Sequence, residues 1–192
     1  TSSQSYPSSI MGTFALLKQV YYDADWYSKG LSKTNDKSLE ALNRNKKLIQ
    51  IFEAKSKINS LRIDKIGDEF NIQYVLLGGG DEYERIEEIK ATNASYILPI
   101  NFPDAYDIED VYSANILQLS DMREWNQRPS NLSQFEENGI QFAITTEGLK
   151  SPNNLKTNIK KAIDHGLSKS KALEALTSIP AKLIGRDEYW GI

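Results

Sequence analysis

Two glutamates stand where apolar runs of the sequence end. Glu53 closes the run 48–52, and Glu147 follows the run 140–144 after two threonines. In α/β enzymes, buried strands often end at catalytic groups or metal ligands. Two carboxylates could form an acid/base pair or bind a hard cation through oxygen. We therefore treat Glu53 and Glu147 as candidate catalytic residues, with ion pairing to nearby lysines as the more common structural role of such groups.

Three consecutive glycines, at 78–80, connect another apolar run to the acidic pair Asp81 and Glu82. Free N–H groups at a helix N-terminus can bind phosphate, but two carboxylates at the same positive end oppose an anion. The sequence has no G-x-G-x-x-G and no Gly-Lys-Ser/Thr motif, so a tight strand-to-helix turn is favoured over a nucleotide site. The candidate binding residues are Gly78, Gly79, Asp81 and Asn101.

The composition excludes several kinds of chemistry. The chain has no cysteine, which excludes thiol catalysis, disulfides and thiolate zinc sites, and its single histidine, His165, excludes a site with two imidazoles. A net charge of −3 gives no reason to expect a nucleic-acid partner. No apolar run approaches the length of a membrane span. We expect a soluble globular protein without a membrane partner; the compartment is left open, with export of a parent protein as one option.

Strands and helices alternate along the chain. Apolar runs predict strands over 48–53, 72–77, 96–100 and 140–146. The sequence also predicts a short helix that ends at about residue 45. Helical spacing and capping residues predict further helices over 10–27, 58–70, 81–91, 113–127, 130–138, 153–165 and 168–184. Consecutive parallel strands need crossover helices, and their handedness places all four strand ends on one face. The candidate residues should therefore lie together.

Two α/β architectures fit four consecutive βα units. One is half of a TIM-like (βα)8 barrel, and the other is a small open α/β sheet; either leaves two sheet edges to be covered. We expect an N-terminal helical segment, 1–47, to pack on an α/β core, 48–192. Together they would form one compact domain, and both ends look cut from a longer chain.

Three stretches resemble the barrel of amidohydrolases, especially the imidazolonepropionase-like branch. The run HGLSKSKALEALTSIPAKLIGRDEYWGI, from 165 onward, resembles the end of that barrel; the stretch 51–103 is similar to its middle; and FAITTEG, 142–148, resembles its eighth strand. The opening, 6–27, is similar to an insertion and helix before strand five. The resemblance implies that this chain is the second half of a (βα)8 barrel and that its four strands are strands five to eight.

The resemblance also implies a site that this chain departs from. The family holds zinc with a His-x-His after strand one, a carbamylated lysine or glutamate on strand four, histidines after strands five and six, and an aspartate after strand eight. Glu53 stands at the strand-five histidine, Gly78 or Gly79 near the strand-six histidine, and Glu147 near the aspartate. An imidazole zinc site cannot be assembled from these residues, so we expect no metal or other cofactor in this chain.

The expected function is what the resemblance implies. The parent protein would hydrolyse amide or cyclic amide C–N bonds, and this chain would be inactive by itself. Its expected partner is the remainder of the barrel. Two alternatives remain: a non-catalytic module that binds a small polar ligand, and a structural domain that forms a homodimer through its open sheet edges.

Overall fold

A computed structural model describes residues 7–190 of the chain, so residues 1–6 and 191–192 of the predicted segments lie outside the described residues. The helices before the third strand are α1 (Ile10–Ser28), α2 (Lys37–Asn45), α3 (Lys57–Phe70), the 3-10 helix η1 (Glu82–Arg85) and α4 (Ile86–Ala91). The later ones are α5 (Val111–Ile116), α6 (Leu119–Gln127), the 3-10 helix η2 (Arg128–Ser130), α7 (Asn131–Glu137), α8 (Asn154–Asp164), α9 (Lys169–Leu176) and α10 (Ser178–Leu183).

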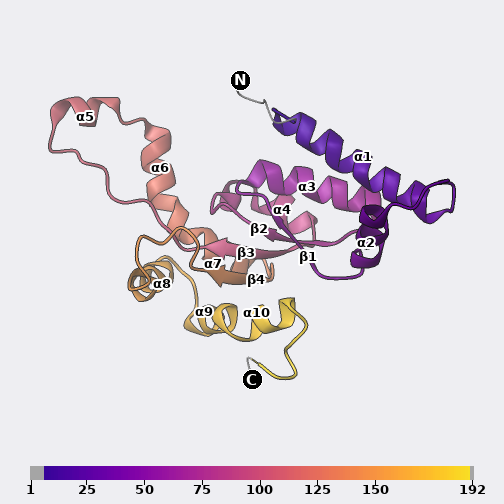
Figure 1. The fold of residues 1–192 in the computed structure, drawn as a ribbon. Helices are drawn as coiled ribbons and strands as arrows, with labels where there is room; N and C mark the ends of the chain where they lie inside the picture. The colour runs from indigo at the N-terminus through magenta and orange to yellow at the C-terminus, as the bar shows by residue number, and fades with distance from the viewer. Residues whose placement is uncertain (1–6, 191–192) are drawn as a thin grey trace.

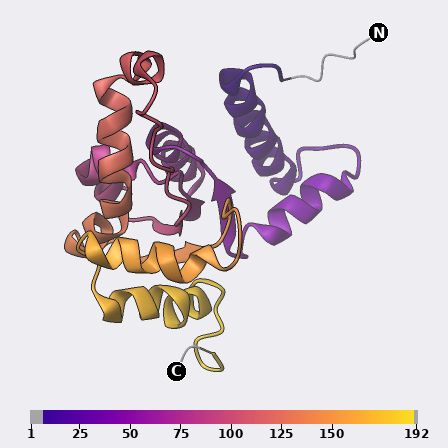
Figure 2. The same ribbon diagram turned by 90° about the vertical axis from the view of Figure 1, so that its left-hand side faces the viewer.

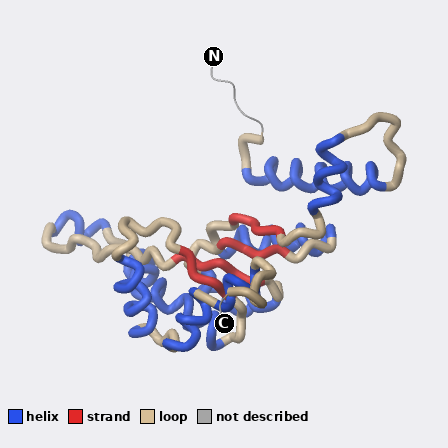
Figure 3. The backbone as a smooth tube through the Cα atoms, turned by 60° about the horizontal axis from the view of Figure 1, so that its bottom comes forward, coloured by secondary structure: helices blue, strands red, loops and turns tan. Residues whose placement is uncertain are grey.

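Four short strands form one parallel sheet. They are β1 (Gln50–Glu53), β2 (Tyr74–Leu77), β3 (Ser95–Pro99) and β4 (Phe142–Thr145), and they pair in the order β1-β2-β3-β4. Figure 3 shows the strands side by side, and helices separate successive strands in the sequence. A strand order that never reverses is typical of a barrel segment, whereas an open doubly wound sheet reverses its order at a switch point. The fold is therefore α/β, with a four-stranded parallel sheet consistent with half of a TIM-like barrel.

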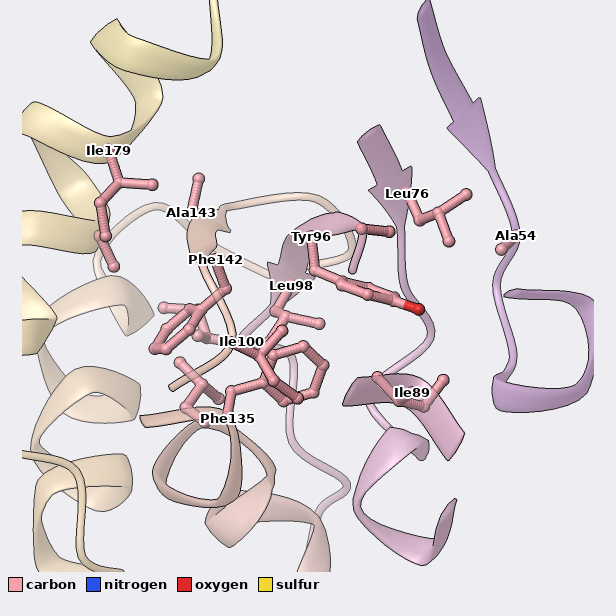
Figure 4. Packing of buried hydrophobic residues seen from close by; sticks show 14 of the residues in the cluster. Ala54, Leu76, Ile89, Tyr96, Leu98, Ile100, Phe135, Phe142, Ala143 and Ile179 are labelled. Atoms are coloured by element: carbon pink, nitrogen blue, oxygen red, sulfur yellow. The ribbon is translucent and has the colours of Figure 1, made fainter. Parts of the chain in front are cut away.

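One face of the sheet carries the core. Phe52, Leu76, Tyr96 and Phe142 occupy one cross-strand row, because each pairs in register with the next. The ring of Phe135 from α7 packs edge-on against Tyr96 at 5.1 Å and against Phe142 at 5.8 Å. Figure 4 shows this cluster, with Ala143 pointing to the other side of the sheet from Phe142. Successive side chains of a strand alternate between faces, so this row lies on one face of the sheet. Phe135 of α7 covers part of that face.

The next cross-strand row lies on the opposite face and ends near the carboxyl ends of the strands. Its members are Glu53, Leu77, Ile97 and Ala143. This face is less completely covered, because Leu77 and Ile97 are half-buried, whereas Leu76 and Tyr96 of the core row are fully buried.

Two helix boundaries are explained by the residues beside them. Ser9 begins α1, where its hydroxyl oxygen accepts a hydrogen bond of 3.1 Å from the Gly12 N–H. Gly185 follows α10 with a φ of +67°, a left-handed conformation that favours glycine. Ser9 and Gly185 therefore mark the observed start of α1 and end of α10.

Other predicted helices are interrupted. The single helix predicted over 168–184 is wrong: α9 ends at Leu176 and α10 begins at Ser178. Pro180 has no N–H to donate to the carbonyl of Leu176, and its ring would clash with that carbonyl in a continuous helix. The helix predicted over 113–127 is likewise divided into α5 and α6, because Gln118 forms a capping box with Asp121 that starts a new helix. The helix over 81–91 begins as the 3-10 turn η1.

The N-terminal helix α1 packs on α3 and on the start of β2 through aromatic and charged side chains. The hydroxyls of Tyr21 and Tyr74, both buried, are hydrogen-bonded at 2.7 Å. Lys18 and Tyr22 both contact the Glu69 carboxylate of α3. Figure 1 shows α1 lying beside α3, while the segment with α5 and α6 extends away from the sheet. In Figure 2 the orange and yellow C-terminal helices stack at the bottom, apart from α1 and α2.

None of the helices in the described part of the chain is both long enough and apolar enough to cross a membrane.

Candidate functional site

A cavity of about 330 Å³ lies at the carboxyl ends of the strands. Each strand contributes a residue that follows it: Lys55 after β1, Gly78 after β2, Asn101 after β3 and Glu147 after β4. Arg128 from η2 is a further lining residue. The volume is at the small end of ligand sites, which range from about 300 to 1,000 Å³. The parallel topology thus brings together residues that are far apart in the sequence.

Most of the candidate residues line this cavity, and two do not. Gly78, Gly79, Asn101 and Glu147 are among its lining residues. Glu53 lies outside the lining and is ion-paired with Lys55. Asp81 also lies outside the lining.

Asp81 holds the start of α3. Its carboxylate accepts a hydrogen bond of 2.8 Å from the backbone N–H of Lys57 and lies 3.4 Å from the Lys57 ammonium. These contacts connect the loop after β2 to the loop after β1. Asp81 therefore stabilises the loops next to the cavity without lining it.

Lys55 is the cation next to both candidate catalytic glutamates. Its ammonium group contacts the Glu53 carboxylate and lies 3.9 Å from a carboxylate oxygen of Glu147. The hydrogen bond and charge of Glu53, and then the charge of Glu147, raise the pKa of Lys55, so it is a stable cation. Lys55 also has a φ of 56°, in the left-handed region that few non-glycine residues adopt. Both glutamates are therefore ion-paired with one lysine.

Gly79 allows the loop after β2 to touch the loop after β1. A Cβ atom at Gly79 would lie 2.3 Å from the carbonyl oxygen of Lys55 and 3.0 Å from the backbone nitrogen of Ser56. These are backbone atoms that no rotamer change can move. Glycine is therefore required here to position Lys55 at the cavity.

The backbone N–H groups of the glycine loop are already occupied by a buried carboxylate. Glu82 is fully buried and accepts hydrogen bonds from the N–H groups of Gly79 at 2.6 Å and Gly80 at 3.0 Å. The side-chain amide of Asn131 donates a third bond of 3.0 Å. Burial raises the pKa of Glu82, and the Gly79 N–H and the Asn131 amide oppose that rise. A phosphate would have to displace Glu82, so the loop is a tight turn and not an anion site.

Arg128 fastens the same loop from the other side. Its guanidinium donates a hydrogen bond of 2.5 Å to the carbonyl oxygen of Gly79 and one of 2.6 Å to the Glu124 carboxylate. Both terminal nitrogens of the guanidinium therefore donate hydrogen bonds within the protein. Arg128 contributes positive charge to the cavity wall and rigidity to the loop.

Asn101 lies against the loop after β4. A Cβ atom at Gly148 would lie 2.3 Å from the Asn101 amide nitrogen, and Gly148 has a φ of +76°, so glycine is doubly favoured there. The amide oxygen of Asn101 is buried and has no hydrogen-bond partner within residues 7–190. An unsatisfied buried acceptor costs free energy.

The residues at the strand ends do not fit the zinc ion that the resemblance implies. In the described part of the chain, no three side chains of His, Cys, Asp or Glu lie close enough to hold a metal ion. Gly78 and Gly79 have no side-chain ligand atom, and Lys55 is paired with Glu53 and Glu147. An ammonium group beside two carboxylates competes with a metal cation for them.

His165 lies apart from these strand-end residues. It is the C-cap residue of α8, next to Gly166, and its carbonyl oxygen accepts a hydrogen bond of 3.0 Å from Ser133. This matches the predicted position at a helix C-terminus.

Two charged residues of the cavity lining, Lys55 and Arg128, are absent from the sequence-based candidates. Lys55 entered the sequence analysis only among the lysines that could pair with the carboxylates, although its position directly after a strand end was a usable signal. Arg128 had no such signal, because it contacts Gly79 across 49 positions of sequence. Only the folded chain brings them together.

Comparisons with known proteins give one fold likeness. No protein-family model and no curated protein matches the sequence. The structure is similar to the crystal structure of an amidohydrolase from Thermotoga maritima, with a TM-score of 0.72 at 16% sequence identity. The match covers 96% of this chain and 48% of the other, so this chain spans about half the length of that amidohydrolase. At this identity the likeness shows the fold alone, an α/β fold consistent with half of a TIM-like barrel.

Proposed function

We propose that this chain is one half of an amidohydrolase-like protein, of the imidazolonepropionase-like branch, and that its cavity binds a small polar molecule. The observation that carries the proposal is the convergence of all four parallel strands on one polar cavity. In (βα)8 enzymes the carboxyl ends of the strands hold the substrate. The fold likeness to an amidohydrolase supports the same placement.

The proposed reaction belongs to the parent protein. That protein would hydrolyse C–N bonds of amides or cyclic amides, and this chain alone would have no hydrolytic activity. A barrel enzyme draws its site from the loops of all eight strands, and four strands are present within residues 7–190. The two glutamates of this half are ion-paired with Lys55. We therefore propose that they help to bind a small polar molecule and do not act as catalytic groups in this chain.

A thermal-shift screen against polar metabolites, run beside an amide-hydrolysis screen with and without zinc, tests this proposal. We expect at least one small amide to raise Tm, since a ligand that binds only the folded state stabilises it, and no turnover. Glu147→Gln should reduce the shift, whereas Glu137→Gln, an exposed site on α7, should not. If no compound of the set raised Tm, the proposed binding function would be wrong. If this chain hydrolysed any of the amides, the proposal that it is inactive alone would be wrong.

The open edges of the sheet support a proposed partner. Within residues 7–190, neither β1 nor β4 pairs with a further strand on its outer side. Ile49 and Ile51, at the β1 edge, are 50% and 56% exposed. Unpaired edges with apolar side chains are sites of association, and we propose that the remainder of the barrel covers them. A second copy of this chain is the alternative occupant; a monomer in sedimentation velocity at micromolar concentration would argue against that copy.

A further inference from the structure

We propose that copies of this chain associate head to tail, with the turn between α1 and α2 of one copy inserting Leu31 into an apolar cavity on the next copy. That cavity lies on the arm, which we define as residues 104–127 and which contains α5 and α6. Neither surface shares a lining residue with the cavity at the strand ends. This inference therefore does not rest on the proposed function.

The arm carries an apolar cavity that opens at the surface. Its volume is about 360 Å³, and its lining is mainly apolar and aromatic, with Ala105, Tyr106, Ile108, Leu117, Met122 and Trp125 among its residues. Ile108 and Met122 are 68% and 53% exposed. At the base of the arm, the Lys161 ammonium of α8 lies 5.5 Å from the centroid of the Trp125 ring, which holds the arm against α8. Exposed apolar patches bordered by polar residues are typical of protein–protein contact sites.

The arm is strongly acidic. Residues 104–127 include six acidic residues and one basic residue, a net charge of −5, whereas the whole chain has a net charge of −3. Asp107 and Glu109 are both exposed and flank Ile108 in the sequence. The partner that fits this surface therefore presents an apolar side chain between positive charges.

The turn between α1 and α2 has that pattern. Leu31 is 58% exposed and lies in the sequence between Lys29 and Lys33, which are also exposed. Lys29 is ion-paired with Asp25 of α1 as well. Residues 29–47, which contain this turn and α2, include six basic residues and two acidic residues. The turn and the arm therefore both present an exposed aliphatic side chain, and their charges are opposite in sign.

The two surfaces lie on opposite sides of the molecule. Figure 1 and Figure 2 place the arm and the α1–α2 turn at opposite ends of the chain's fold, and Figure 3 agrees. A contact between them therefore requires a second copy. Because the two faces differ, the contact is heterologous, and further copies can add at either end.

Sedimentation equilibrium of this chain between about 5 and about 200 µM tests the inference. We expect the mean mass to rise with concentration at low salt, and to rise less in about 0.5 M NaCl, because salt screens exposed charges. Leu31→Asp places a carboxylate against the acidic arm, and Ile108→Ser removes an aliphatic wall of the cavity. Each should weaken association by roughly tenfold or more, as expected for loss of a buried aliphatic side chain.

A matched control and a second cavity variant separate this contact from general effects. Leu173→Asp makes the same change on α9, at a side chain that is 65% exposed, and it should leave association unchanged. Circular dichroism of each variant should match that of the wild type, because the replaced side chains are exposed. Met122→Ser changes another exposed lining residue and takes the place of Ile108→Ser if that variant does not fold.

Mixing the two variants gives the most specific readout. Leu31→Asp keeps an intact arm, and Ile108→Ser keeps an intact turn. Together they should form a one-to-one complex that does not grow further, although each is a monomer alone. This pairing is specific to a head-to-tail contact, since a two-fold symmetric contact would lack the same residue on both sides.

Three results would overturn the inference. The first is a wild type that stays monomeric at every concentration. The second is a pair of variants that lose association alone and do not pair when mixed. The third is association that survives in both variants but is lost in Ile51→Lys, which would place the contact at the β1 edge. None of these results bears on ligand binding at the strand ends, so the proposed function stands or falls separately.

Discussion

Replacing Glu82 with alanine should strongly destabilise the protein, because this carboxylate organises the loop that forms one wall of the cavity. Glu82 is fully buried and accepts three hydrogen bonds, from the N–H groups of Gly79 and Gly80 and from the Asn131 side chain. The Asn131 amide oxygen in turn accepts a bond of 2.8 Å from the Tyr83 N–H. Loss of Glu82 would leave three donors without an acceptor.

The magnitude follows from those donors. A buried donor left unsatisfied costs about 1–3 kcal/mol. Water entering the vacated space would restore some of the bonds, and removal of a buried charge would offset part of the loss. We therefore expect Glu82→Ala to lower the free energy of unfolding by about 3 kcal/mol. Glu82→Gln keeps one acceptor oxygen but turns an NH2 group toward other donors, so it should cost about 2 kcal/mol.

Urea unfolding followed by circular dichroism would measure these changes. Glu87→Ala is the matched control, because Glu87 is an exposed acid on the following helix α4; it should cost less than about 1 kcal/mol. If Glu82→Ala were no more destabilising than this control, the buried carboxylate would not be organising the glycine loop and our reasoning about that wall would be wrong.

Three further predictions concern the same framework. Gly79→Ala should destabilise by about 2 kcal/mol or more in urea unfolding, since its Cβ would meet the Lys55 backbone; wild-type stability would refute the close approach. Burial raises the pKa of Asp64 to about 6, above its unfolded value, so the wild type should lose stability as pH rises from about 4 through about 6. Asp64→Asn should remove that loss and raise the free energy of unfolding by about 1 kcal/mol near neutral pH, after allowance for solvent screening. If the free energy of unfolding of this variant depended on pH as that of the wild type does, the prediction would be wrong. Tyr21→Phe should cost about 1 kcal/mol by removing the buried bond to Tyr74, and a double-mutant cycle with Tyr74→Phe should show the coupling.

The sequence predicts the order of elements well because the apolar runs are separated by helical patterns. All four strands lie within or next to their predicted ranges. β1, β2 and β4 are shorter than predicted, whereas β3 has the predicted length but begins at Ser95 and not at 96. The errors fall where one residue overrides a periodic pattern. Pro180 divides the predicted helix over 168–184, and the Gln118 capping box divides the one over 113–127.

The candidate site is predictable only in part, for a topological reason. Residues that directly follow parallel strands must share one edge of the sheet, and so Gly78, Asn101 and Glu147 could be expected together. Ion pairing and distant contacts depend on side-chain geometry that periodicity does not contain. The roles of Lys55 as the central cation and of Arg128 as the brace of Gly79 needed the folded structure.

A crystal structure of this chain soaked with zinc would test the central claim most directly. The account predicts that the carboxyl ends of the four strands surround one cavity, that Lys55 pairs with Glu53 and Glu147, and that no zinc lies among the strand-end residues. Zinc held by Glu53 and Glu147 with Lys55 displaced, or strand ends that do not share one cavity, would contradict it.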